Sequence, residues 1–257
     1  ESVDFITNNV CTINYQTFSG CTGLNNTIRF APNTKIGSFA FYRCTGLTGS
    51  IQFAPNTRIG SYAFANCIGI DVPDFTPIVK LSAFSFSNCT NLKGPIKFSD
   101  SIEEIPMGAF YNCISIESID IRRIKIIGDE SFYNCTNLID EIRLSPDLVY
   151  VGSKAFYNTN FSSIKYYAPM PPLYCSPDSF PPNEEAFEMP PLYIYNYFCG
   201  ISIKDDNNTD AEINITIPRP NIDYAFIEYD QEKDDSTTLA NNIEELLTNM
   251  AEIDNYS

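Results

Sequence analysis

Residues 36–58 read IGSFAFYRCTGLTGSIQFAPNTR, and the sequence on both sides restates this pattern. A repeat with a fixed period of about 20 to 50 residues is typical of a solenoid, because a single unit cannot bury its apolar side and stacking supplies the core. The stretch therefore predicts the architecture before any single residue is considered.

Seven copies align on a phenylalanine that recurs at spacings of 22 to 24 residues. These phenylalanines are Phe18, Phe41, Phe64, Phe86, Phe110, Phe132 and Phe156. In the first six copies a cysteine follows three residues later: Cys21, Cys44, Cys67, Cys89, Cys113 and Cys135. Apolar and polar residues alternate in segments such as 27–30, 50–53, 95–98 and 141–144, which predicts one short strand per copy. The Ala-Phe-x-x-Cys segment is too short for a stable helix, and we expect a tight turn held by packing.

The run I-G-x-x-A-F-x-x-C-x-x-L-x-x-x-I-x-F-x-P resembles the BspA-type, or Treponema-type, leucine-rich repeat. The sequence of residues 44–51 (CTGLTGSI) is similar to the variants of this repeat found in protist surface proteins. This resemblance implies a curved stack of parallel strands, and a family of cell-surface or secreted proteins that bind other proteins rather than catalyse. We accordingly expect an α/β solenoid, a right-handed superhelix of about seven repeats with a mixed C-terminal cap.

Composition divides the chain into three predicted parts. Residues 1–167 form the solenoid, residues 168–220 a cap rich in proline and aromatic residues, and residues 221–257 an acidic tail with a short amphipathic helix between Leu239 and Ile253. Strand candidates in the cap are 192–195 and 212–217. The chain starts at Glu1 without a methionine or an apolar secretory segment, so we expect a mature or excised fragment.

Charge is unevenly distributed and excludes some classes of partner. Residues 171–257 carry 3 Lys and Arg against 18 Asp and Glu, a net charge of −15, whereas residues 1–170 carry a net −1. Nucleic acid and anionic membranes both require a positive surface, and the sequence shows no basic stripe. No apolar run approaches the length of about 18 residues that a membrane-spanning helix needs.

The sequence offers no catalytic site. It contains no histidine, so the histidine-dependent triads and the common zinc-protease motif are absent. No two cysteines lie closer than ten residues, so the paired spacing of zinc sites is missing as well. We predict a protein that is not an enzyme and binds no metal or cofactor.

The cysteines divide into two groups. The six periodic ones are expected to face the stack interior as packed thiols, with disulfides between adjacent repeats or a metal as alternatives. Cys11, Cys175 and Cys199 lie off the period, and Cys175 with Cys199 is the candidate disulfide if the compartment is oxidising.

N-glycosylation sequons would suit a secreted protein. The seven sequons begin at Asn25, Asn88, Asn134, Asn160, Asn207, Asn214 and Asn255. At Asn88 and Asn134 the motif arises from the repeat itself, and there the asparagine is better interpreted as a turn residue bonding backbone.

Two sets of periodic residues are candidate recognition surfaces. The first set, here called the strand column, consists of the outward middle residues of the strands, on the concave face: Arg29, Gln52, Asp74, Lys97, Asp120, Arg143 and Lys165. The alternative is that these are ordinary solvated positions of an exposed sheet. The second set follows the core phenylalanine and either lies exposed on the opposite side or packs between turns: Tyr42, Tyr111, Tyr133 and Tyr157.

Three functional hypotheses follow. The first is an extracellular or cell-surface adhesion or ligand-binding ectodomain, monomeric, that engages a host or matrix protein through the strand column. The second is a cytoplasmic scaffold that recruits a partner through its acidic C-terminal segment. The third is autoinhibition, in which the segment of net charge −15 folds back onto the strand column, whose side chains sum to +2.

Overall fold

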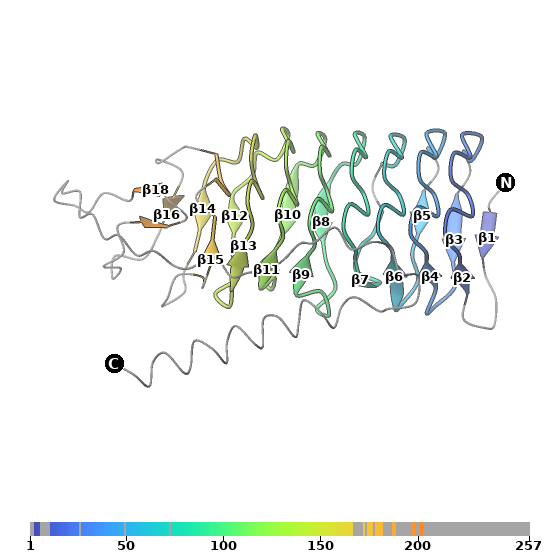
Figure 1. The fold of residues 1–257 in the computed structure, drawn as a ribbon, viewed down its shortest axis with the longest axis horizontal. Helices are drawn as coiled ribbons and strands as arrows, with labels where there is room; N and C mark the ends of the chain where they lie inside the picture. Colours follow the sequence, from blue (N-terminus) through green and yellow to red (C-terminus); the bar gives the residue numbers. More distant parts are fainter. Residues whose placement is uncertain are drawn as a thin grey trace. The chain divides into compact units, whose positions relative to one another are not determined.

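The repeats contribute two rows of very short strands (Figure 1), and within each row the strands pair in parallel in separate sheets of two to four strands. The row here called the first strand face contains β1 (Val3–Phe5), β3 (Ile28–Phe30), β5 (Ile51–Gln52), β8 (Pro95–Lys97), β10 (Ser118–Asp120), β12 (Ile142–Arg143), β14 (Ile164–Lys165) and β16 (Phe187–Glu188). The second strand face contains β2 (Thr12–Ile13), β4 (Lys35–Ile36), β6 (Thr57–Ile59), β7 (Ile78–Lys80), β9 (Glu104–Ile105), β11 (Ile126–Ile127), β13 (Tyr150–Val151) and β15 (Tyr174–Cys175). An antiparallel pair, β17 (Tyr197–Phe198) and β18 (Ile201–Ser202), follows.

The prediction of one strand per copy was incomplete. The four alternating segments do form strands (β3, β5, β8 and β12), but the second strand of each repeat was not predicted. That second strand is often only two residues long, as in β4, and two residues carry no alternation to detect.

This computed structural model describes residues 3–5, 11–25, 27–48, 50–71, 73–166, 172, 174–176 and 178–181, together with the strands at 187–188, 197–198 and 201–202. No helix occurs within these described residues, so the label α/β is too loose, while the predicted solenoid of short parallel strands is confirmed. Residues 1–213 form one compact unit and residues 214–257 a second. The predicted strands at 192–195 and 212–217, the helix between Leu239 and Ile253, and the last three sequons lie outside the described residues.

A column of stacked phenylalanine rings forms the centre of the core. Successive rings lie 5.0 to 5.9 Å apart between centroids, with interplanar angles of 15° or less. The column contains the seven predicted phenylalanines and an eighth, Phe180, which stacks on Phe156 at 5.1 Å. Phe180 was missed because the prolines around it hide the repeat. Buried Leu47, Ile70 and Leu92 belong to a parallel aliphatic column, and the solenoid core is continuous from copy to copy.

The segment around each core phenylalanine is a tight turn, as predicted, and it is held by the next repeat. Phe39, Phe41 and Arg43 donate their backbone N–H groups to the carbonyls of Ser61, Ala63 and Ala65, at 2.8 to 2.9 Å. The residues two before and two after the phenylalanine have positive φ, for example 56° at Phe39 and 57° at Arg43. Bulky side chains rarely adopt this conformation, so the hydrogen bonds between repeats must over-determine it.

The first strand face is interrupted at Asp74. Residues 73–75 form no strand, because Pro73 has no N–H to donate to a neighbouring strand. The Asp74 carboxylate instead accepts hydrogen bonds from the backbone N–H (2.9 Å) and hydroxyl (2.8 Å) of Thr76. Asp74 was predicted as a strand residue, and that prediction was wrong.

Candidate interaction surfaces

The structure brings the other six residues of the strand column into pairwise register on the first strand face. Arg29 pairs with Gln52, Lys97 with Asp120, and Arg143 with Lys165. Their strand neighbours Ile28, Ile51, Ile96, Ile142 and Ile164 are buried. Strands separated by about 4.8 Å thus carry one polar side chain each in a regular row.

Most charges of the strand column are paired within the same face. Arg29 contacts the Asp4 carboxylate and the Gln52 amide oxygen, both at 3.1 Å. Glu141 bonds both Arg143, at 2.5 Å, and Lys165, at 2.6 Å. Lys165 and then Arg143 lower the pKa of the Glu141 carboxyl, because they bond its charged form.

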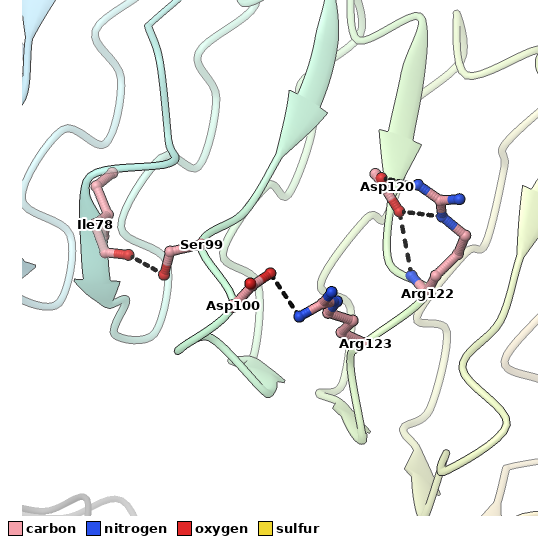
Figure 2. Close-up of polar contacts among 6 residues, drawn as sticks. All are labelled: Ile78, Ser99, Asp100, Asp120, Arg122 and Arg123. Carbon is pink, nitrogen blue, oxygen red and sulfur yellow. Dashed lines mark hydrogen bonds and ion pairs between the residues drawn. The ribbon is translucent and has the colours of Figure 1, made fainter.

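The turn after β10 extends this pairing toward the neighbouring repeat (Figure 2). Arg122 turns back to Asp120 and donates from Nε at 2.8 Å, and this contact is the main cause that lowers the pKa of Asp120. Arg123 points the other way and contacts the Asp100 carboxylate at 2.8 Å. On the adjoining turn, the Ser99 hydroxyl donates to the Ile78 carbonyl at 2.7 Å. Adjacent turns are therefore fixed to one another by side chains as well as by backbone.

Three of the four predicted tyrosines form a stack. Tyr133 lies between Tyr111, at 4.8 Å between ring centroids, and Tyr157, at 5.3 Å. Tyr42 does not belong to it: its ring meets Phe39 edge-on at 5.4 Å and lies under the Arg43 guanidinium at 5.1 Å. Tyr111 and Tyr133 are half-buried and Tyr157 is 43% exposed, so the tyrosines both pack between turns and expose their edges.

A second aromatic stack and an amide ladder were not predicted. Tyr62 stacks between Phe39, at 4.8 Å, and Phe84, at 4.9 Å. The amide ladder runs along the asparagines two residues after the core phenylalanine, each side-chain amide donating to the one before it: Asn88, Asn112, Asn134 and Asn158. Asn88 and Asn134 are thus turn residues, as interpreted. Their side chains, however, bond the side-chain amides of the ladder asparagines in adjacent repeats rather than backbone groups.

The periodic cysteines are thiols that bond backbone. The five thiols from Cys44 to Cys135 are fully buried, and each donates to the carbonyl of the core phenylalanine one repeat earlier at 2.9 to 3.3 Å. Burial raises the pKa of Cys89 and of Cys135 to about 12. These groups stay protonated near neutral pH, and the protonated thiol is the unreactive form.

Two cysteines differ from this pattern. Cys21 is exposed, contrary to the prediction of six interior thiols, because among the described residues no earlier phenylalanine turn covers it. Cys175 is disulfide-bonded, and Cys199, its predicted partner, lies outside the described residues.

The second strand face carries a row of cations that sequence reasoning missed. Lys35 on β4 is in register with Arg58 on β6, and Arg58 with Lys80 on β7. We call these three residues the second-face cation row. Lys35 and Arg58 occupy the same position of a motif, Ala-Pro-Asn-Thr-Lys/Arg-Ile-Gly-Ser, that residues 31–38 and 54–61 share, whereas Lys80 lies outside this motif. The pairing of the unpredicted strands places all three side by side.

Neither a metal centre nor a membrane helix emerges from the described part of the chain. It holds no group of three or more His, Cys, Asp or Glu side chains placed to bind a metal ion. It also holds no helix with the length and apolar character needed to cross a membrane.

The repeats match a known family over two thirds of the sequence. The family of the BspA type leucine rich repeat region matches residues 1–71 and 57–172, in six copies. The chain belongs to the BspA-type leucine-rich-repeat family. Its strand pairing, its core and its candidate surfaces are therefore those of a BspA-type solenoid; the protist-type resemblance stays a prediction.

Two solved structures are similar to this BspA-type chain. A leucine rich cell surface protein from Faecalibacterium prausnitzii is 19% identical, with a TM-score of 0.57, over 67% of this chain and 49% of that one. The chain thus spans about half the length of that protein. A leucine-rich repeat protein from Bacteroides ovatus is 17% identical, with a TM-score of 0.31, over 60% of this chain and 69% of that one. No curated protein matches the sequence.

Proposed function

We propose that this chain is a non-catalytic recognition module of a cell-surface or secreted protein, and that its first strand face binds a protein partner. The observation that carries the proposal is three pairs of polar side chains on this face, each pair in register on two paired parallel strands. Solenoids use such extended surfaces for partners. The buried core beneath this face is continuous from repeat to repeat.

The ion pairs on this face prepare it for binding. Glu141 holds both Arg143 and Lys165 in place, so less side-chain freedom remains to be lost when a partner binds. Arginine is also enriched among the residues that contribute most to protein interfaces. A partner with mixed charges that complement the row is the class that fits.

The test is binding of the full chain to a panel of immobilised extracellular-matrix proteins, with immobilised serum albumin as the negative control. The variant Lys97→Ala with Arg143→Ala removes two exposed cations from the strand column. Its matched control, Lys93→Ala with Arg123→Ala, removes two exposed cations outside the column. We expect the affinity for the bound matrix protein to fall by about tenfold or more for the first variant only. Equal losses of affinity in both variants, or no binding to any protein of the panel, would count against the proposal.

The chemistry of the cysteines supports an oxidising compartment. Cys175 is disulfide-bonded, and disulfides persist mainly in secreted and surface proteins. The buried thiols of Cys89 and Cys135, whose pKa values are raised by burial, resist oxidation in that environment. A surface or secreted location is thus compatible with both the disulfide and the free thiols.

Thiol counting separates this location from the cytoplasmic scaffold. The protein from its native source is denatured without reductant, alkylated and weighed intact. We expect seven labels, one for each free cysteine of the described residues, with the peptide that contains Cys175 unlabelled. Labelling of all nine cysteines would favour the scaffold, with recruitment through the acidic C-terminal segment.

The tyrosine stack is a candidate second surface. Tyr133 has both ring faces covered, one by Tyr111 and the other by Tyr157, so a partner reaches the edge and hydroxyl group of this middle ring. This arrangement favours hydrogen bonding over stacking.

A further inference from the structure

The second-face cation row places three like charges side by side. Lys35, Arg58 and Lys80 occupy registered positions on three neighbouring strands, and strands pair at a spacing of about 4.8 Å. Lys35 and Arg58 are exposed, while the residues before and after each of them are buried. Both side chains therefore point out of the sheet.

Lys35 and Arg58 lack the ion pairs that several other exposed cations of the described surface make. No ion pair involves Lys35 or Arg58 within the described residues, whereas Lys93 pairs with Asp71 and Lys125 with Glu103. Residues 31–39 and 54–62, which form the surrounding turns, contain no Asp or Glu. Like charges directly opposite each other on paired strands are destabilising, so the sheet tolerates a cost here that a bound anion would remove.

The row has defined ends. On one side β2 presents the uncharged Thr12 opposite Lys35. On the other side Glu104, on β9, lies close enough to Lys80 for that cation to act on its carboxyl, although burial raises the pKa of Glu104 overall. Three cations in a line of about 10 Å suit a short, densely charged segment of a ligand.

The geometry selects among anionic ligands. Both β4 and β6 are hydrogen-bonded on both sides, so a peptide cannot add to them as a further strand. An extended acidic peptide presents carboxylates on one side only at every second residue, about 6.8 Å apart, which does not match the strand spacing of about 4.8 Å. Nucleic acid needs a larger positive footprint than three cations in a chain of net charge −16.

We propose that the second-face cation row binds a sulfated polysaccharide, whose closely spaced sulfates lie along Lys35, Arg58 and Lys80. This surface is separate from the strand column and goes beyond protein recognition by the first face. The two faces would allow one solenoid to hold a protein and a polysaccharide at the same time.

The test measures binding of a fluorescent heparin oligosaccharide to the full chain by anisotropy, over a series of salt concentrations. The variant Lys35→Gln with Arg58→Gln is compared with Lys97→Gln with Arg143→Gln, because each removes one exposed lysine and one exposed arginine. For the first variant only, we expect the heparin affinity to fall by about tenfold or more. The salt dependence of that affinity should also become shallower, by an amount that corresponds to about two ion contacts. The charge-preserving variant Lys35→Arg with Arg58→Lys should retain binding, and circular dichroism should show all variants folded.

Three results would overturn the proposal. The first is no binding of heparin by the unmodified chain. The second is an equal loss in both glutamine variants, which would indicate nonspecific attraction. The third is competition by poly-glutamate at least as strong as by unlabelled heparin, which would assign the row to an acidic peptide.

Discussion

The two strand faces of this solenoid are built on the same core but differ in how they treat charge. On the first face, Glu141 forms ion pairs with both Arg143 and Lys165, and Asp4 forms one with Arg29. On the second face, Lys35 and Arg58 lie in register without an ion pair among the described residues. A periodic scaffold can thus present paired charges on one strand face and unpaired cations on the other. The first is suited to a partner of mixed charge and the second to an anion.

The largest expected effect tests whether the two faces share one core. Phe64 is fully buried and stacks on Phe41 at 5.0 Å and on Phe86 at 5.3 Å. Its replacement by alanine should lower the free energy of unfolding by about 3 to 5 kcal/mol, and should weaken matrix-protein and heparin binding together. Urea denaturation with parallel binding assays measures this. Loss of binding on one face alone would show that the faces are supported independently.

The next effect is confined to the second face. Gly60 directly follows β6, and a Cβ at this position would lie 2.7 Å from the Ser38 backbone nitrogen and 2.9 Å from the Ile36 carbonyl oxygen. Backbone cannot move aside as a side chain would, so Gly60→Ala should cost about 1 to 3 kcal/mol of stability and disturb the register of Lys35 and Arg58. Thermal unfolding with heparin titration checks this prediction.

The control for that substitution is Gly23→Ala. A Cβ at Gly23 would meet no atom within 4 Å, so its unfolding temperature and its heparin affinity should not change. A similar loss for both alanine variants would contradict the close approach of backbones as the cause.

The periodic spacing of single residues made much of this fold predictable. Phe64, Cys67 and Ile70 repeat at fixed intervals because each copy must bury the same side chain against the next. The spacing predicts stacking, but it does not reveal which short segments will pair. Thus β4 was missed, with only two residues, and so was the row that contains Lys35.

The candidate surfaces were predictable only in part, because their properties depend on pairing. The alternation of Glu141–Leu144 places Glu141 and Arg143 on one side of a strand, yet the second bond of Glu141, to Lys165, requires the neighbouring repeat. The break at Asp74 could have been predicted from Pro73.

A smaller change in the free energy of unfolding, this time a stabilisation, is expected for a substitution in the interior beneath both faces. The Ser85 hydroxyl is buried and, within the described structure, has no hydrogen-bond partner, and the equivalent positions in the adjacent repeats are Ala63 and Ala109. Ser85→Ala should stabilise the fold by about 1 kcal/mol, because it removes an unsatisfied polar group. Chemical denaturation measures the change, and Ser87→Ala serves as the matched comparison. Destabilisation by Ser85→Ala would indicate a hydrogen bond that the folded chain makes and the structure does not contain.

The substitution with the smallest expected effect on stability, Glu141→Gln, would remove a difference between the two strand faces. Glu141 is the shared partner of Arg143 and Lys165, so Glu141→Gln removes the compensation on the first face and should give that face the anion affinity of the second. Because the two cations lower the pKa of Glu141 from its ordinary value of 4.5, its contribution to stability is present above pH 4.5 and is lost as the pH falls through the lowered value. The unfolding temperatures of the variant and the unmodified chain should therefore differ slightly at neutral pH and converge in acid.

Heparin binding should rise in the variant and fall again when Arg143→Gln is added. If Glu141→Gln leaves heparin binding unchanged, then local compensation is not what distinguishes the two faces, and the second face must owe its affinity to the geometry of its row.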